Sequence, residues 1–318
     1  MVERLILGYG AELHPCAHAH LLAADVPVTF LDLRGRPLGH LRGSTRHDPS
    51  PRIAQYRLYQ NFAERLSQAA ATIEQKLLNA RQVLGAHKSN HPEFDWTFAR
   101  QTTDHALSAL PRATTLDQIR GHEGHAARAY WQIFPRMIRN PLFAFDGRNR
   151  RPPKDPTNAL LSYVYVYLSN ELSSILEAHG LDPYLGYLHE PRPGRPSLAL
   201  DLLEPLRPSL ADRFVLNSIN RRRFSPEHFS SPGLQGAVYL APEGKKTFFT
   251  AIEEWFAATE EQCGGTVQSP RSLLDKTVVA FKRETLDRHL RPEDLPESLP
   301  DTTPVLARNT PDGVGHGE

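Results

Sequence analysis

An acidic residue, Glu123, interrupts the apolar face of a segment that has helical periodicity. The apolar residues of that face recur at spacings of three and four, at Leu116, Ile119, Ala126 or Ala127, Tyr130 and Phe134. A carboxylate that faces a protein core is costly unless a cation, a metal ion or hydrogen-bond donors meet it. Glu123 is therefore a candidate site residue.

Two glycines, Gly121 and Gly124, flank this acid. Each costs about 1 kcal/mol relative to alanine inside a helix, so their presence asks for a reason. Because glycine has no side chain, another part of the protein can approach the helix closely at these positions. The sequence thus predicts a close approach of other segments beside Glu123.

A second pair of acids, Asp201 and Glu204, lies in the leucine-rich segment 198–204. At a spacing of three on a helix, the two carboxylates are about 60° apart and share a face. Because adjacent acids repel each other, the pair favours a nearby cation, either an arginine or a divalent metal ion. An ordinary acidic helix face has the same spacing, so the pair alone does not define a site.

A single histidine, His189, stands in the proline-rich segment GYLHEPRPG. A lone histidine in such a loop is more often a surface residue than a ligand. Together with carboxylates, however, one imidazole makes a donor set that suits Mg²⁺ or Mn²⁺, and manganese tolerates the nitrogen better. Such a site serves phosphodiester chemistry, in which the metal stabilises charge on the phosphate and activates a hydroxyl group.

Basic residues concentrate in one part of a chain whose formal net charge is only +1. Between residues 136 and 154, one acid, Asp146, stands among the basic residues Arg136, Arg139, Arg148, Arg150, Arg151 and Lys154. This cluster indicates contact with a polyanion, although a solvated arginine-rich loop has the same composition. The candidates for phosphate contacts are Arg150, Arg151, Lys154, Arg221 and Arg222.

Other chemistries lack their sequence signatures. The segment HEGH at 122–125 has its histidines three residues apart, whereas the zinc-protease motif H-E-x-x-H needs four. The sequence also contains no P-loop, no dinucleotide fingerprint after a strand and no G-x-S-x-G elbow. These absences weaken the interpretation of the chain as a nucleotide hydrolase, a redox enzyme or an acyl transferase.

The elements that must position these residues predict an α+β protein. Residues 1–48 indicate a small β-containing domain, with strand candidates at 2–8, 27–33 and 36–42 and a short helix at 18–25. Three strands are few for an independent sheet, so this domain either leans on the rest of the chain or is incomplete.

Helical periodicity then continues through residues 49–290, the predicted metal-dependent catalytic domain. The expected helices are 53–85, ended by Gly85; 94–110; one with a capping box of Thr115 and Gln118 that carries Glu123; a central buried helix capped by Asp155, with Pro156 at its first position and Gly180 past its end; one from Ser197, kinked at Pro205 and Pro208; 245–262; and 272–290. Residues 291–318 have little apolar content and are expected to be disordered.

The bulk composition narrows the class of protein. The chain has 318 residues, 40% of them hydrophobic and 23% charged, which is ordinary for a globular protein. No run approaches the ~20 apolar residues of a membrane span, and the N-terminus has no signal-peptide pattern. Two cysteines are too few for a disulfide framework. We expect a cytoplasmic protein that does not act in a membrane.

Four motifs together resemble a known family. In order they are GHEGHAARAYW (121–131), DPTNALLSYVYVYL (155–168), GLDPYLGYLHE (180–190) and SLALDLLEPLRPSLADRFVLNSIN (197–220). They resemble the universal CRISPR-associated integrase, the first-numbered CRISPR-associated protein, which inserts new spacers into the repeat array. The likeness extends from about residue 52 to about residue 290 and includes EGKKTFF at 243–249.

The resemblance implies a β-domain used for dimerisation and an α-helical catalytic domain. It implies a Mg²⁺ or Mn²⁺ site held by Glu123, His189 and Glu204, which would be the catalytic residues, with Asp201 orienting a ligand or facing the substrate. The implied reaction is attack by a 3′-hydroxyl of prespacer DNA on a phosphodiester at the repeat boundary. The implied partners are DNA, a second copy of the chain in a homodimer, and a small ferredoxin-like companion protein.

One departure from the family leaves other functions open. Members normally have several more strands before the segment that matches LILGYGAELH, whereas this chain begins almost at that segment. The N-terminal domain is thus expected to be abbreviated, or the chain to be a portion of a longer or fused protein. The alternative functions are a non-catalytic DNA-binding scaffold of the same fold and a metal nuclease that acts on branched DNA.

Overall fold

The computed structural model describes most of the helical part of the chain and short stretches of its N-terminal part. The described residues are 5–8, 10–24, 26, 28–31, 37–41, 43, 49–231, 236–258, 260–261 and 267–290. The tail 291–318, predicted to be disordered, lies outside them. No helix among the described residues is long and apolar enough to cross a membrane.

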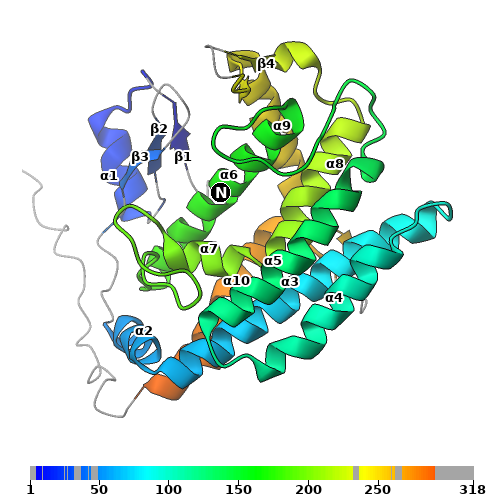
Figure 1. The fold of residues 1–318 in the computed structure, drawn as a ribbon. Helices are drawn as coiled ribbons and strands as arrows, with labels where there is room; N and C mark the ends of the chain where they lie inside the picture. The colour runs from blue at the N-terminus through cyan, green and yellow to red at the C-terminus, as the bar shows by residue number, and fades with distance from the viewer. Residues whose placement is uncertain are drawn as a thin grey trace, which may run out of the picture.

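A small sheet forms the N-terminal part of the described chain (Figure 1). Its strands are β1 (Leu5–Leu7), β2 (Val28–Leu31) and β3 (Pro37–Leu41), in the order β1-β2-β3. Strand β2 pairs parallel with β1 and antiparallel with β3, and helix α1 (Pro15–Ala23) connects the two parallel strands. The three predicted strands and the short helix between them are thus confirmed.

The first long helical stretch differs from the prediction of one helix over 53–85. It divides into α2 (Ser50–Gln60) and α3 (Phe62–Asn90). Asn61 has an extended backbone between them, and its side chain accepts a hydrogen bond from the first turn of α3, so it caps a new helix. Gly85 does not end α3, because it lies inside the helix where the ring of Trp96 packs against it.

The remaining elements confirm a mainly helical α+β fold (Figure 1). The helices are α4 (Thr97–Ala109), α5 (Leu116–Ile133), α6 (Pro156–Ala178), α7 (Ser197–Leu203), α8 (Arg213–Asn220), α9 (Pro242–Ala257) and α10 (Pro270–Phe281). Short strands form two antiparallel pairs, β4 (Phe229–Ser230) with β5 (Tyr239–Leu240) and β6 (Glu260–Glu261) with β7 (Val267–Gln268). A π-helical turn, Arg207–Asp212, follows the proline-containing break after α7.

The predicted helix caps that frame the candidate residues are present. The Thr115 side chain accepts a hydrogen bond from the backbone N–H of Gln118 at the start of α5. The Asp155 carboxylate accepts one from the first turn of α6, and Pro156 occupies the first helical position. Gly180 follows α6 with a φ of +76°, a conformation that favours glycine.

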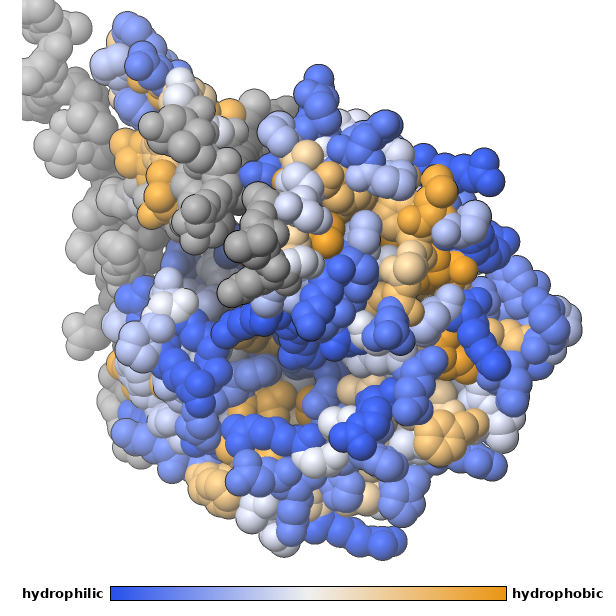
Figure 2. Space-filling model, turned by 45° about the horizontal axis from the view of Figure 1, so that its top comes forward, coloured by the Kyte–Doolittle hydropathy of each residue, from blue (hydrophilic) through white to orange (hydrophobic). Residues whose placement is uncertain are grey.

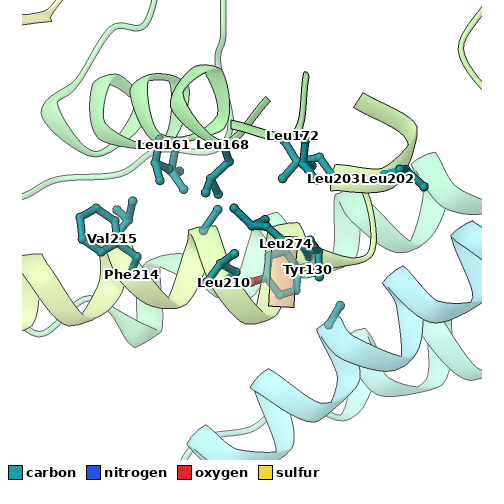
Figure 3. Close-up of a cluster of buried hydrophobic side chains, with 14 of the residues drawn as sticks. Tyr130, Leu161, Leu168, Leu172, Leu202, Leu203, Leu210, Phe214, Val215 and Leu274 are labelled. Atoms are coloured by element: carbon teal, nitrogen blue, oxygen red, sulfur yellow. The ribbon is translucent and has the colours of Figure 1, made fainter. Parts of the chain in front are cut away.

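Helix α6 runs through the centre of the core (Figure 3). Its Leu161, Leu168 and Leu172 are fully buried, and the close-up shows Leu161 above side chains of α8 and Leu172 beside those of α7. The expectation of a central buried helix is therefore confirmed for this face. It does not hold all round the helix, because Val166 is 53% exposed.

Only one glycine near the candidate residues is required for close packing. A Cβ at Gly186 would lie 2.6 Å from Asp201 Oδ2 and 2.8 Å from atoms of Ser197, so the loop 181–196 crosses α7 at this glycine. A Cβ at Gly121 or Gly124 would meet no atom within 4 Å. The prediction that these two glycines let other segments approach Glu123 was wrong, because they face open space.

These two kinds of glycine predict opposite effects of alanine. Gly186→Ala should lower the free energy of unfolding by about 1–3 kcal/mol, because the added methyl overlaps Asp201 and Ser197. Gly124→Ala should raise it by about 1 kcal/mol, the helix-propensity difference, because nothing obstructs the methyl. Urea unfolding of both variants tests this, and equal stability of the two would contradict the packing described.

A buried acid, Asp212, lies in the core between α5 and α6. It is 1% exposed and accepts hydrogen bonds from Tyr130 Oη at 3.0 Å and Tyr165 Oη at 2.5 Å. Burial raises the pKa of the Asp212 carboxyl to about 6, although both hydroxyl groups favour its ionised form. Burial also raises the pKa of each tyrosine well above its ordinary value.

The raised pKa of Asp212 predicts a pH-dependent stability. Between its ordinary pKa of 3.8 and the folded value of about 6, the folded state binds more protons, so stability falls as pH rises through this window. In the wild type this carboxyl should lower the free energy of unfolding by ~3 kcal/mol between pH 4 and pH 7, since one pKa unit corresponds to ~1.4 kcal/mol. In Asp212→Asn this pH-dependent decrease should be absent. Urea unfolding of the wild type and Asp212→Asn at pH 4 and pH 7 measures this change. If the two proteins differed in stability by the same amount at both pH values, the raised pKa of Asp212 would be contradicted.

Candidate active site

Side chains from distant parts of the sequence meet at Lys76 of α3. Its ammonium lies 2.5 Å from Glu123 Oε1 of α5 and 2.7 Å from Glu204 Oε2 at the end of α7. His189, in the loop that crosses α7, has its Nε2 atom 3.9 Å from Glu204 Oε1. The structure therefore brings Glu123 and Glu204 together at one lysine that was not predicted, and it places His189 beside Glu204.

The site is open on one side. The Glu204 side chain is 6% exposed, whereas those of Glu123 and His189 are 25% and 30% exposed. Glu123 is therefore not the most buried acid, as its place on the apolar face of α5 had suggested. The more deeply buried acids are Glu204 and Asp201. A ligand would reach the centre past Glu123 and His189.

Glu204 stays ionised because two cations oppose the effect of burial. Burial disfavours its charge, but Arg207 and Lys76 outweigh burial and hold the pKa of its carboxyl at about 2. Arg207 Nη1 lies 2.9 Å from Glu204 Oε1. Burial would lower the pKa of Lys76, but Glu204 and Glu123 outweigh it and the pKa is raised. The expected cation beside the acids is thus a lysine and an arginine.

Asp201 binds the backbone of the His189 loop. Its carboxylate accepts hydrogen bonds from the backbone N–H groups of Tyr187 at 2.7 Å, Leu188 at 2.9 Å and His189 at 3.0 Å. Its Oδ1 atom also lies 2.5 Å from His189 Nδ1. Burial raises the pKa of Asp201 in spite of these partners. If Nδ1 donates to this carboxylate, the Nε2 lone pair points toward Glu204.

Three helices clamp the loop that carries His189. Arg65 of α3 donates to the Tyr187 carbonyl at 2.8 Å and to Glu190 at 2.6 Å. Arg120 of α5 donates to the Leu188 carbonyl at 2.6 Å. Gln55 of α2 donates to the carbonyls of Asp182 and Leu185 at 2.8 and 2.9 Å. A proline-rich stretch without regular structure is held in place by these side chains, which spacing in the sequence did not reveal.

Lys76 had a signal in the sequence that resembles that of Glu123. The buried residues of α3 recur at helical spacings: Arg65, Ala69, Thr72, Ile73, Leu77, Ala80, Val83 and Leu84. Lys76 falls on the same face, three residues after Ile73. A charged residue on an apolar face marks a candidate site residue, but the spacing does not say which segment it meets; in the structure Lys76 forms an ion pair with Glu123.

The predicted phosphate-contacting residues lie on the surface of the molecule. Arg150, Arg151, Lys154, Arg221 and Arg222 are all exposed. By contrast, Arg148 of the basic cluster is half-buried, donates to Asn158 Oδ1 at 2.7 Å and lies 5.4 Å from the centre of the Tyr165 ring. Among the described contacts, neither His122 nor His125 bonds to Glu123, His189 or Glu204. Figure 2 shows one largely hydrophilic face of the molecule, with apolar patches between polar side chains.

Glu123, His189 and Glu204 are the residue types that a divalent cation prefers as ligands. As the described side chains stand, no group of three or more His, Cys, Asp and Glu is arranged to hold a metal ion. Lys76 Nζ lies between the carboxylates of Glu123 and Glu204. Two carboxylates and one imidazole are suitable ligands for Mg²⁺ or Mn²⁺, and a cation is already favoured at this position.

The sequence matches a known protein family over most of its length. The family model described as CRISPR associated protein Cas1 matches residues 1–254. A CRISPR-associated endonuclease Cas1 of Chlorobaculum tepidum is 39% identical over 246 residues, which cover 76% of this chain and 71% of the relative.

Two solved structures share the fold. A Cas1 protein from Thermotoga maritima has a TM-score of 0.72 at 23% identity, and the match covers 89% of this chain and 85% of that one. A casposase bound to integration product has a TM-score of 0.68 at 24% identity, with 90% of this chain and 83% of that one covered. With its four ordered motifs, its mainly helical fold and the match over most of its length, the chain belongs to the Cas1 family of CRISPR-associated proteins.

Proposed function

We propose that this chain is a metal-dependent DNA integrase and endonuclease that inserts spacer DNA into a CRISPR array. The 3′-hydroxyl of a prespacer would attack a phosphodiester at the repeat boundary. The observation that carries the proposal is the meeting of Glu123, His189 and Glu204, which come from two helices and a loop far apart in sequence. The relative named an endonuclease and the casposase bound to integration product support this type of reaction.

The catalytic roles follow from the contacts of each side chain. Glu123, His189 and Glu204 would hold the Mg²⁺ or Mn²⁺, which would stabilise charge on the phosphate and activate the attacking hydroxyl. Asp201 fixes the orientation of the His189 ring through its contact with Nδ1. Arg207, itself largely buried, holds the Glu204 carboxylate through an ion pair. The protein would form no covalent intermediate; its residues position the reacting groups.

The proposal includes the partners implied by the family. The substrates are DNA molecules, the prespacer and the repeat. The β-domain of residues 1–48 would take part in a homodimer, and a small ferredoxin-like companion would join two dimers. The helical part, residues 49–290, would carry the catalytic site.

Replacing the proposed ligands tests the reaction. Glu123→Gln and His189→Ala should each lower Mn²⁺-dependent strand transfer into a repeat-bearing DNA by about 100-fold or more, since partners outside the ligand set alone account for ~10- to 100-fold. Glu74→Gln, an exposed acid on α3, is the matched control and should retain activity. Gel analysis of labelled products measures transfer, and circular dichroism confirms folding.

The same products separate the alternatives. Transfer by either variant at the wild-type rate would contradict the proposed site. Cleavage of branched DNA without joined product would instead identify a metal nuclease. DNA binding that is unaffected by metal, with no product at any Mn²⁺ concentration, would identify a non-catalytic scaffold.

The exposed basic residues predict a salt dependence of DNA binding. If Arg150 and Arg151 contact phosphates, replacing both with alanine should reduce the slope of log affinity against log salt by about 0.9 for each contact on duplex DNA. The double variant Arg100→Ala, Arg112→Ala removes the same charge from exposed positions outside the cluster and serves as control. Fluorescence anisotropy at several salt concentrations gives the slopes; identical slopes would assign the arginines to the loop alone.

A further inference from the structure

We propose that Lys76 is a resident cation of the metal position, and that metal entry displaces its ammonium to bind a DNA phosphate. Lys76 would thereby couple the binding of metal to the binding of DNA. The inference rests on the proposed function, because it takes Glu123 and Glu204 as metal ligands. It adds a positioning role for a residue that belongs to none of the four sequence motifs.

The contacts of Lys76 place it where a metal ion would compete with it. Its ammonium is 2.5 Å from Glu123 and 2.7 Å from Glu204, and it contacts one oxygen of each. A divalent ion held by the same two carboxylates would compete with the ammonium for their negative charge. Since the Lys76 side chain is 14% exposed and the site is closed on the Glu204 side, the two cations cannot share this position.

Lys76 is the cation that can move, and Arg207 is not. Arg207 is held by its ion pair with Glu204 and by the Tyr165 ring, whose centre lies 5.0 Å from the guanidinium carbon. Lysine carries its charge on a flexible chain of four carbons. The Glu123 and His189 side chains are partly exposed, so the entrance to the site lies beside the residues that a displaced ammonium would pass.

The charges explain why displacement would favour DNA. In the arrangement described, Lys76 and Arg207 neutralise Glu123 and Glu204. A divalent ion that replaces the ammonium leaves an excess of positive charge, and a phosphate at the entrance would neutralise it. Metal and DNA would then each strengthen the binding of the other, as thermodynamic linkage requires.

Binding of Mn²⁺ without DNA tests the competition directly. Electron paramagnetic resonance of free Mn²⁺ gives its dissociation constant for the intact chain, for Lys76→Met and for Lys76→Arg. Lys76→Met should bind Mn²⁺ about tenfold more tightly or better, because the competing charge is gone, and Lys76→Arg should not. Lys88→Met removes the same charge about 18 Å along α3 and should match the wild type.

The coupling is tested by adding a short DNA duplex. In the wild type the duplex should tighten Mn²⁺ binding several-fold, and in Lys76→Met this gain should shrink toward none. Thermal unfolding with and without Mn²⁺ shows whether each variant is folded before it is compared.

The outcomes separate this inference from the proposed function. Unchanged or weaker Mn²⁺ binding by folded Lys76→Met would overturn the inference, provided that Glu123→Gln still abolishes binding. If Glu123→Gln does not affect Mn²⁺ binding, the proposed ligand set itself fails. If Lys76→Met binds Mn²⁺ more tightly but DNA still tightens that binding as in the wild type, Lys76 competes with the metal but does not couple metal binding to DNA binding.

Discussion

The ion pairs of Lys76 with Glu123 and Glu204 are the interaction on which the rest of the site depends. Carboxylates from two helices are placed on either side of one ammonium, and two such charges lie close together only when a cation neutralises them. Helices α3, α5 and α7 therefore converge on a charged point at the open edge of the core. The same two carboxylates would suit another cation, as the proposed function requires.

A second layer of contacts gives this point its geometry. Asp201 is buried and binds the His189 ring together with three backbone N–H groups of the same loop, so the histidine is directed by a fixed acceptor. Gly186 allows this loop to lie against α7 without a gap. Arg65, Arg120 and Gln55 hold it from other helices. These hydrogen bonds hold a loop without regular structure against three helices, the kind of support that positioning of reacting groups requires.

Much of the fold and part of the site could be predicted from the sequence. Periodicity identified the helices, and caps at Thr115, Asp155 and Gly180 identified several of their ends. The break at Asn61 was missed because the apolar periodicity continues from α2 into α3. The capping hydrogen bond of the Asn61 side chain ends one helix and begins the next in spite of that periodicity. Lys76 and the residues that clamp the loop could not be assigned, because spacing along one helix does not reveal which distant segment it faces.

The most direct test of the central claim is to locate bound manganese. Crystals of the protein with a short DNA, grown with Mn²⁺ and measured at the manganese absorption edge, would show the ion by anomalous scattering. The account predicts a peak among Glu123, His189 and Glu204, with the Lys76 ammonium withdrawn from both carboxylates. A peak elsewhere, or Lys76 unmoved between the two glutamates while the DNA is bound and Mn²⁺ is in excess, would contradict it.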